Sequence, residues 1–293
     1  MTVRIVDVPV PPLPLEPHLR PGVIDVRRRL LLWVALPMLL CAAWALAGGG
    51  QQVSGSMVLL VLGGFAALAT ALFWGSARQQ LAFTAANAAA STLVYEGKLA
   101  EACAAFEANA GRFRAPALHA LSVFNLADTE VQRGNLRRAL SLAAAVATHR
   151  SLLRSPMVAS SAPSLVASCY ALLGELENAK AWMPEAQRAA ATTAIEVCRV
   201  PEAIIACREG RFADVARMYR ERRRAIEAAL AGEDLRALRL MRAYAIASDP
   251  ASSEAEKAEA IAIGRPGAPG ECDYLATSWP ELGEFLKRSG MSR

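Results

Sequence analysis

The sequence predicts an all-α protein with two transmembrane helices followed by an α-solenoid of about four to five helical hairpins. Two stretches of 18 residues without a charge, Leu30–Ala47 and Met57–Trp74, predict the membrane part. A glycine turn that recurs every 36 to 40 residues in the remaining chain predicts the solenoid. We therefore expect four segments: a leader at 1–29, a membrane hairpin at 30–77, a repeat domain at 78–263, and a loop with a capping helix at 264–293.

The leader is rich in proline, which favours extended polyproline conformation over a packed core. Its prolines are Pro9, Pro11, Pro12, Pro14, Pro17 and Pro21. We interpret residues 1–29 as a flexible leader, with a proline-motif ligand as the alternative.

Each uncharged stretch would be about 27 Å long as a helix, close to the hydrocarbon thickness of a bilayer. Trp33, Trp44 and Trp74 stand near the ends of the stretches, where an amphipathic ring is stable at the headgroup level. A buried helical hairpin of a soluble core is the competing interpretation. It is disfavoured because such helices rarely lack a polar face.

Charge predicts the orientation of this hairpin. Arg27–Arg29 precede the first stretch and Arg78 follows the second, whereas the connecting segment Gly48–Ser56 has no charge. The positive-inside rule then places the N-terminus and the C-terminal domain in the cytoplasm. Heavy arginine and alanine use, with only four lysines, is typical of a GC-rich bacterial genome, so we expect an inner-membrane protein. Signal-peptide cleavage after Ala45–Ala47 is the alternative.

Composition narrows the class of partner. From Arg78 onward the chain has 27 basic and 24 acidic residues, a balance too even for a nucleic-acid binder. None of the six cysteines forms a C-x-x-C pair, and such scattered cysteines are usually buried apolar residues in a reducing compartment. They stand at Cys41, Cys103, Cys169, Cys198, Cys207 and Cys272.

The repeat is defined by its turns and by the residues at fixed distances from them. The turn glycines are Gly97, Gly134, Gly174 and Gly210. Alanine stands seven residues before and five residues after the first three of them, which lets paired helices approach closely. These alanines are Ala90, Ala102, Ala127, Ala139, Ala167 and Ala179. A bulky residue, Phe106, Met183 or Tyr219, stands nine residues after the first, third and fourth glycines.

This pattern resembles the tetratricopeptide repeat family. The best match is Ser164–Ala186, with Tyr170 and the sequence Leu173-Gly174-Glu175-Leu176 in the expected places. The fourth unit departs from the family because Val215 replaces the expected alanine, and a fifth hairpin at Leu235–Ile263 is degenerate. The units also exceed the family's usual length. An unrelated helical bundle is the alternative.

The resemblance implies a concave groove, lined by the first helix of each unit, that binds an extended peptide or a partner helix. Carried over position by position, the groove residues are Asn87, Ser91, Phe124, Asp128, Gln132, Ser164, Ser168, Ile204 and Arg208. This set carries little charge, so we do not expect it to clamp the terminal carboxylate of a peptide.

Catalytic motifs are not apparent. The three histidines, His18, His119 and His149, stand in no metal-ligand or catalytic spacing, and no G-x-S-x-G turn occurs. We expect no enzyme activity, no cofactor and no metal. The arginines between Arg217 and Arg242 could hold an acidic peptide or lipid headgroups, but neighbouring carboxylates favour a solvated helix face.

These observations predict a non-catalytic adaptor or scaffold that holds a protein partner at the bilayer through its concave face. Three alternatives remain open. The repeats could form a regulatory or assembly collar in an oligomeric membrane complex, or face the periplasm and assist envelope assembly, or belong to an enzyme of unrecognised type.

Overall fold

The computed structural model describes residue 19 and residues 55–148, 156–190 and 195–293. The predicted span Leu30–Ala47 and the leader, apart from Leu19, lie outside these ranges. The described part is entirely helical and contains no strand, as the sequence predicts. Its α-helices are α2 (Gly55–Tyr95), α3 (Leu99–Arg112), α4 (Pro116–Gln132), α5 (Leu136–Thr148), α6 (Pro156–Leu173), α7 (Leu176–Ala190), α8 (Arg199–Arg208), α9 (Phe212–Ala229), α10 (Gly232–Ser248), α11 (Glu254–Gly264) and α12 (Pro280–Arg288).

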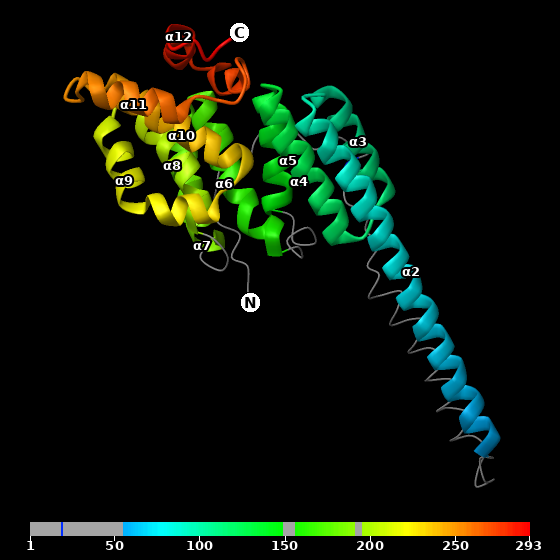
Figure 1. Ribbon diagram of the computed structural model, residues 1–293. Coiled ribbons are helices and arrows are strands. Elements are labelled where there is room, and N and C mark those ends of the chain that lie inside the picture. The colour runs from blue at the N-terminus through cyan, green and yellow to red at the C-terminus, as the bar shows by residue number, and fades with distance from the viewer. Residues whose placement is uncertain (1–18, 20–54, 149–155, 191–194) are drawn as a thin grey trace.

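The helices form successive antiparallel hairpins that stack side by side (Figure 1). Each helix from α2 to α7 packs mainly against its neighbours in the chain. Two short 3₁₀ helices complete the described elements: η3 (Ile195–Cys198) precedes α8, and η4 (Asp273–Ala276) precedes α12.

The four predicted turns share one backbone geometry. Each turn glycine has a positive φ, between 73° and 81°, which residues with a Cβ rarely adopt. In the first turn, Gly97 N donates to Val94 O at 2.9 Å and Lys98 N donates to Leu93 O at 2.9 Å. The same pair of bonds recurs at Gly134, Gly174 and Gly210 and defines a Schellman helix ending. We call the end of the stack that carries these glycines the turn end.

The alanines of the repeat pattern are almost fully buried, at 1% exposure or less. Ala203, seven residues before Gly210, is also buried and extends this position to the fourth unit. The bulky residues Phe106, Met183 and Tyr219 belong to the same continuous core. Small residues thus allow close helix contact, and large residues fill the space between hairpins.

The fifth hairpin, α10–α11, ends its first helix differently. No glycine turn follows Ser248, and α11 starts instead with a capping box between Ser253 and Glu256. This difference agrees with the degenerate last unit that the sequence predicts.

A buried ion network stabilises the turn end of the first two hairpins. The Glu130 side chain is fully buried. It accepts hydrogen bonds from Arg138 Nη1 at 2.6 Å, from Asn135 Nδ2 at 2.6 Å and from Arg133 Nη1 at 3.2 Å. Arg138 also pairs with Glu107 of α3 at 2.8 Å, so the network joins three helices.

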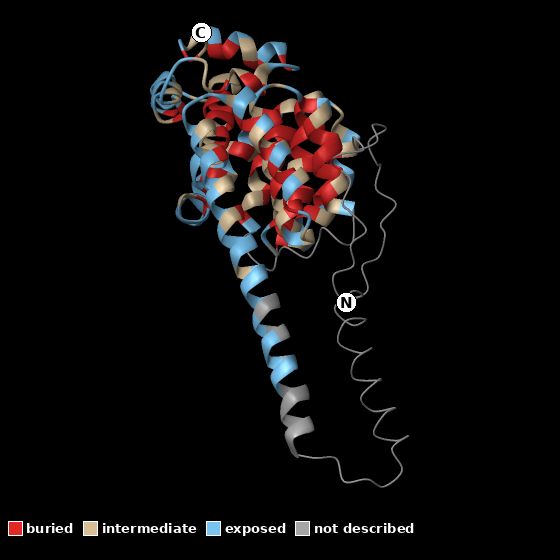
Figure 2. Ribbon diagram, turned by 90° about the vertical axis from the view of Figure 1, so that its right-hand side faces the viewer, coloured by how far each residue is buried: buried red, intermediate tan, exposed pale blue. Residues whose placement is uncertain are grey.

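Helix α2 is much longer than the others and runs without a break through the domain boundary predicted at residue 78. Its second half packs in the stack, whereas its first half projects away from it, and its described side chains there are exposed (Figure 2). Phe73 and Trp74 are 73% and 62% exposed. Judged on described residues alone, no helix is both long enough and apolar enough to cross a membrane. Several side chains of Met57–Trp74 are outside that description.

One residue of the leader enters the core of the stack. Leu19 is fully buried, and its carbonyl oxygen lies 3.1 Å from His119 Nε2. The other ring nitrogen, Nδ1, lies 2.9 Å from the carbonyl oxygen of Ala110. His119 is itself buried, so it joins the leader to the α3–α4 connection.

Candidate functional site

The first helices of the hairpins form the predicted binding face, and its N-terminal part is the most accessible. Asn87 and Ser91 of α2 are partly exposed. Asn125 Nδ2 of α4 donates to Asn87 Oδ1 at 2.8 Å and joins the two helices. Phe124 is partly exposed and packs against the core, so this area offers amide groups beside one aromatic ring.

Further along α4, Asp128 lies near the acidic residues Glu233 and Asp234 in the first turn of α10. Gln132 Nε2 donates to Asp128 Oδ2 at 3.2 Å. Burial, together with the nearby carboxylates of Asp234 and Glu233, raises the pKa of Asp128 to about 7. This part of the predicted groove therefore faces the chain's own helix α10.

Three of the predicted groove residues lie inside the stack. Ile204 belongs to the core at 1% exposure, and Ser164 and Ser168 are buried. Ser164 Oγ donates to Val197 O at 3.1 Å and fixes η3 against α6. A partner cannot reach these side chains unless the helices separate. Their contacts in the structure are packing contacts within the stack.

Arg208 is held by the C-terminal part of the chain. Its Nη2 donates to Leu172 O at 2.6 Å and to Ser278 O at 2.8 Å, and its guanidinium lies 4.2 Å from the Trp279 ring centroid. These contacts use hydrogen bonding and cation–π attraction together. We call residues 264–293 the C-terminal strap, because this segment crosses from α10 to the turn ends of α8 and α4.

Several contacts fix the C-terminal strap. The Tyr274 hydroxyl donates to Glu233 Oε1 at 2.5 Å, and Arg236 pairs with Glu271 at 3.0 Å. Trp279 packs edge-on against Tyr244 of α10 with ring centroids 5.3 Å apart. The sequence predicts a capping segment here but not its position over Arg208 and Asp128. The cluster of aromatic residues after the glycine- and proline-rich loop is the signal that could have suggested it.

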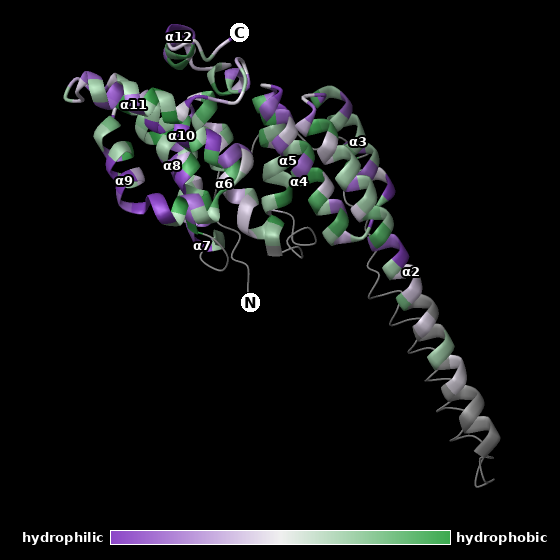
Figure 3. Ribbon diagram, in the orientation of Figure 1, coloured by the Kyte–Doolittle hydropathy of each residue, from purple (hydrophilic) through white to green (hydrophobic). Residues whose placement is uncertain are grey.

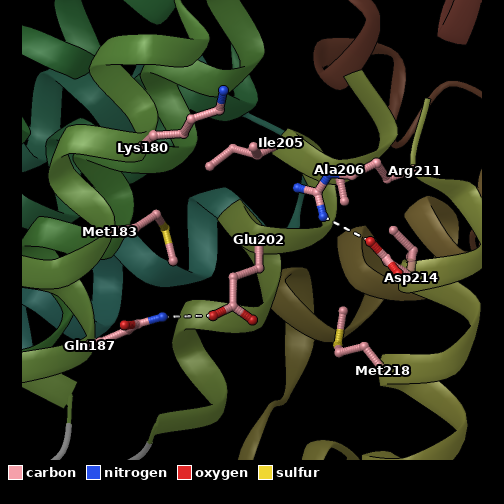
Figure 4. Close-up of a pocket in the computed structure, with 10 residues that line it drawn as sticks. Lys180, Met183, Gln187, Glu202, Ile205, Ala206, Arg211, Asp214 and Met218 are labelled. Carbon is pink, nitrogen blue, oxygen red and sulfur yellow. Dashed lines mark hydrogen bonds and ion pairs between the residues drawn. The ribbon is translucent and has the colours of Figure 1, made fainter. Parts of the chain in front are cut away.

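A separate pocket of about 290 Å³ lies between α7, α8 and α9 (Figure 4). Met183 of α7 and Met218 of α9 stand on opposite sides, and Ile205 of α8 also lines the pocket. The rim is polar: Gln187 Nε2 donates to Glu202 Oε1 at 3.0 Å. Such a site suits one apolar side chain of a partner. The sequence does not predict this pocket, because its lining residues come from three helices.

The arginines of α9 and α10 are mostly paired, although α9 shows a long hydrophilic stretch in Figure 3. Arg222 pairs with the buried Glu196 at 2.9 Å, and Arg223 and Arg239 both pair with Glu227. This pairing agrees with the solvated, partly neutralised helix face that the sequence favours.

Reactive groups are few in the described part. All five described cysteines are buried, and burial raises the pKa of the Cys103 thiol to about 11 and that of Cys272 to about 12. Across residues 55–148, 156–190 and 195–293, no group of three or more metal-ligating side chains is placed to hold an ion. His18 and His149 lie outside the described residues.

No protein-family model, curated protein or solved structure matches this chain. The resemblance to tetratricopeptide repeats therefore rests on the residues around the four glycine turns.

Proposed function

We propose that this chain is a membrane-anchored, non-catalytic adaptor that holds a protein partner beside the bilayer through a tetratricopeptide-like repeat domain. The main support for this proposal is the continuity of helix α2. One continuous helix contains both the second predicted span and the first helix of the stack. A partner bound to the stack would therefore be held at a fixed height above the membrane.

The first half of α2 projects from the stack and exposes an apolar surface that another phase or molecule would have to bury. Its stretch Met57–Trp74 has no charged residue, and its described aromatic side chains Phe73 and Trp74 face outward. Exposed apolar surface of this extent is typical of a membrane or interaction site. A bilayer fits best, because the stretch would be about 27 Å long and Arg78 follows it.

The position of Leu19 supports a hairpin. Leu19 is buried in the stack, whereas Gly55 begins α2 at the tip that points away from the stack (Figure 1). These two positions, at opposite ends of the described structure, are compatible with the predicted first span Leu30–Ala47, which itself lies outside the described residues.

The accessible first-helix surface supports partner binding. We place the binding surface on Asn87, Ser91 and Phe124, because the C-terminal strap and α10 cover the other end of the groove. The sequence places the domain on the cytoplasmic face of a bacterial inner membrane. The buried free thiols fit a reducing compartment.

Two measurements on the full-length protein test this proposal. Carbonate extraction of native membranes should leave the protein in the pellet, and a reporter fused after Arg293 should be active only in the cytoplasm. Release by carbonate would overturn the anchor, and a periplasmic reporter signal would favour the envelope-assembly alternative.

Partner binding is tested by photo-crosslinking in native membranes. A crosslinking residue at Ser91 should capture one protein in stoichiometric amount, whereas the same residue at Glu177, exposed at the start of the second helix α7, should not. Equal capture from both positions, or a product with a second copy of this chain only, would overturn the adaptor. The second result would favour an oligomeric collar.

A further inference from the structure

Where α2 enters the stack, at the end opposite the turn end, three arginines have no carboxylate partner within the described part of the chain. We call this end the base end and Arg78, Arg112 and Arg114 the basal arginine cluster. All three side chains are exposed. Among the described residues none of them forms an ion pair, whereas most basic residues elsewhere in the stack do. Arg112 lies over the Phe113 ring at 5.1 Å, and Arg114 Nε donates to Gly111 O at 3.0 Å.

Carboxylates are absent from the described part of the base end near α2. Arg78 is the only charged residue between Leu30 and Tyr95. In α3 the nearest carboxylate, Glu107, is already paired with Arg138. The first acidic residues after α2, Glu96 and Glu101, belong to the turn end, at the far side of the hairpin. Close to α2, the described residues of the base end therefore present positive charge without a carboxylate.

The height of these arginines above the predicted span follows from helix geometry. Phe83 of α2 packs edge-on against Phe113 with ring centroids 5.2 Å apart, so the α3–α4 connection stands level with residue 83. Nine residues separate Trp74 from Phe83, which is about 14 Å along a helix, and Arg78 lies about 6 Å above Trp74. The headgroup layer on one side of a bilayer is about 5–7 Å thick. Long arginine side chains and the decay of the surface potential over about 8 Å bring all three charges within reach of it.

We propose that the basal arginine cluster binds the phosphates of anionic lipid headgroups and thereby fixes the orientation of the repeat domain on the membrane. A bilayer surrounds α2 on every side. Whether an arginine reaches the headgroups therefore depends on its height along the helix axis rather than on the direction in which it points. Each basic residue near an anionic surface is attracted to it, and this attraction weakens with salt. The inference rests on the proposed membrane anchor.

Hydrogen exchange of the full-length protein in lipid nanodiscs tests this inference. One set of discs contains phosphatidylcholine alone, and the other contains equal parts of phosphatidylcholine and phosphatidylglycerol. We expect the backbone amides of residues 113–119 to exchange at least about threefold more slowly in the anionic discs, and this slowing to vanish in high salt.

Matched variants separate lipid binding from folding. The double variant Arg112→Gln/Arg114→Gln should lose the slowing, and Arg112→Lys/Arg114→Lys should keep most of it because the charge remains. The control Arg265→Gln/Arg288→Gln removes the same charge from the C-terminal strap and should behave as the unmodified chain.

The outcomes are distinct. Equal exchange of the unmodified chain in both kinds of disc, or slowing that survives in Arg112→Gln/Arg114→Gln, would overturn the basal arginine cluster as a lipid site and leave the anchor intact. Failure of the chain to enter either disc would overturn the anchor itself.

Discussion

The turn end and the base end of the stack use charge in different ways. At the turn end Glu130 is buried among Arg133, Asn135 and Arg138, and Arg208 is held by carbonyl oxygens. At the base end, the arginines beside α2 meet no carboxylate in the described part. A charge that is removed from water must be compensated within the protein, whereas an exposed charge remains free for an external partner. The turn end thus stabilises the fold, and the base end remains available for binding.

The largest effect should come from the buried carboxylate of the turn end. Glu130→Ala removes the carboxylate that accepts from Asn135 and Arg133 and one of the two carboxylates that pair with Arg138, and should lower the free energy of unfolding by about 3–5 kcal/mol. Urea unfolding of the full-length protein in detergent, followed by tryptophan fluorescence, measures this change. The control Glu177→Ala removes an exposed partner of Lys180 and should cost less than about 1 kcal/mol. Equal effects for the two variants would contradict the comparison.

The contact between Arg208 and the C-terminal strap should rank second. Arg208→Ala removes two hydrogen bonds to carbonyl oxygens and the cation–π contact with Trp279, for a loss of about 2–3 kcal/mol. Protease sensitivity of the bonds near Ser278 should rise with it. As a control, Arg220→Ala removes an exposed arginine of α9 and should leave the strap protected. An unchanged cleavage rate in Arg208→Ala would show that other contacts hold the strap.

Alanine at two turn glycines separates backbone strain from contact with the strap. Gly97 and Gly134 both have positive φ, but a Cβ at Gly97 meets open space, whereas one at Gly134 would lie 2.9 Å from Thr277 Oγ1. Gly97→Ala should cost about 1 kcal/mol and Gly134→Ala about 2 kcal/mol in unfolding free energy. Adding Thr277→Ala to Gly134→Ala should bring the cost down to the Gly97 value. No recovery in the double variant would mean that the strap does not press on this turn.

Asp128 is the exception at the turn end, because carboxylates rather than cations surround it. Its pKa is raised from 3.8 to about 7, so the folded state binds a proton that the unfolded state has already lost. The contribution of Asp128 to the free energy of unfolding is therefore greatest below about pH 4, and it is lost as the pH rises from there through about 7. Asp128→Asn should remove this dependence and raise the free energy of unfolding at pH 8 by roughly 1–2 kcal/mol. Parallel stability curves from pH 5 to 8 for the two proteins would contradict this assignment.

Local features of the fold could be predicted from the sequence. The glycine turns, the buried alanines beside them and the degenerate fifth unit all follow from short-range patterns, because helix endings and close helix contacts depend on residues a few positions apart. The binding face was harder to predict. Ser164, Ser168 and Ile204 have the spacing of groove residues but are buried. The two serines lie on α6, against which η3 and α8 pack, and Ile204 belongs to the core side of α8.

By itself the sequence determined the helical class, the places of the turns and the uncharged stretches that predict a membrane anchor. These properties depend on local periodicity and composition, which the chain displays directly. Only the tertiary structure decided that α2 continues from the second stretch into the stack, that Leu19 reaches His119, and that the C-terminal strap covers Arg208. Such contacts join residues tens of positions apart, and their geometry depends on how all the hairpins stack rather than on any one segment.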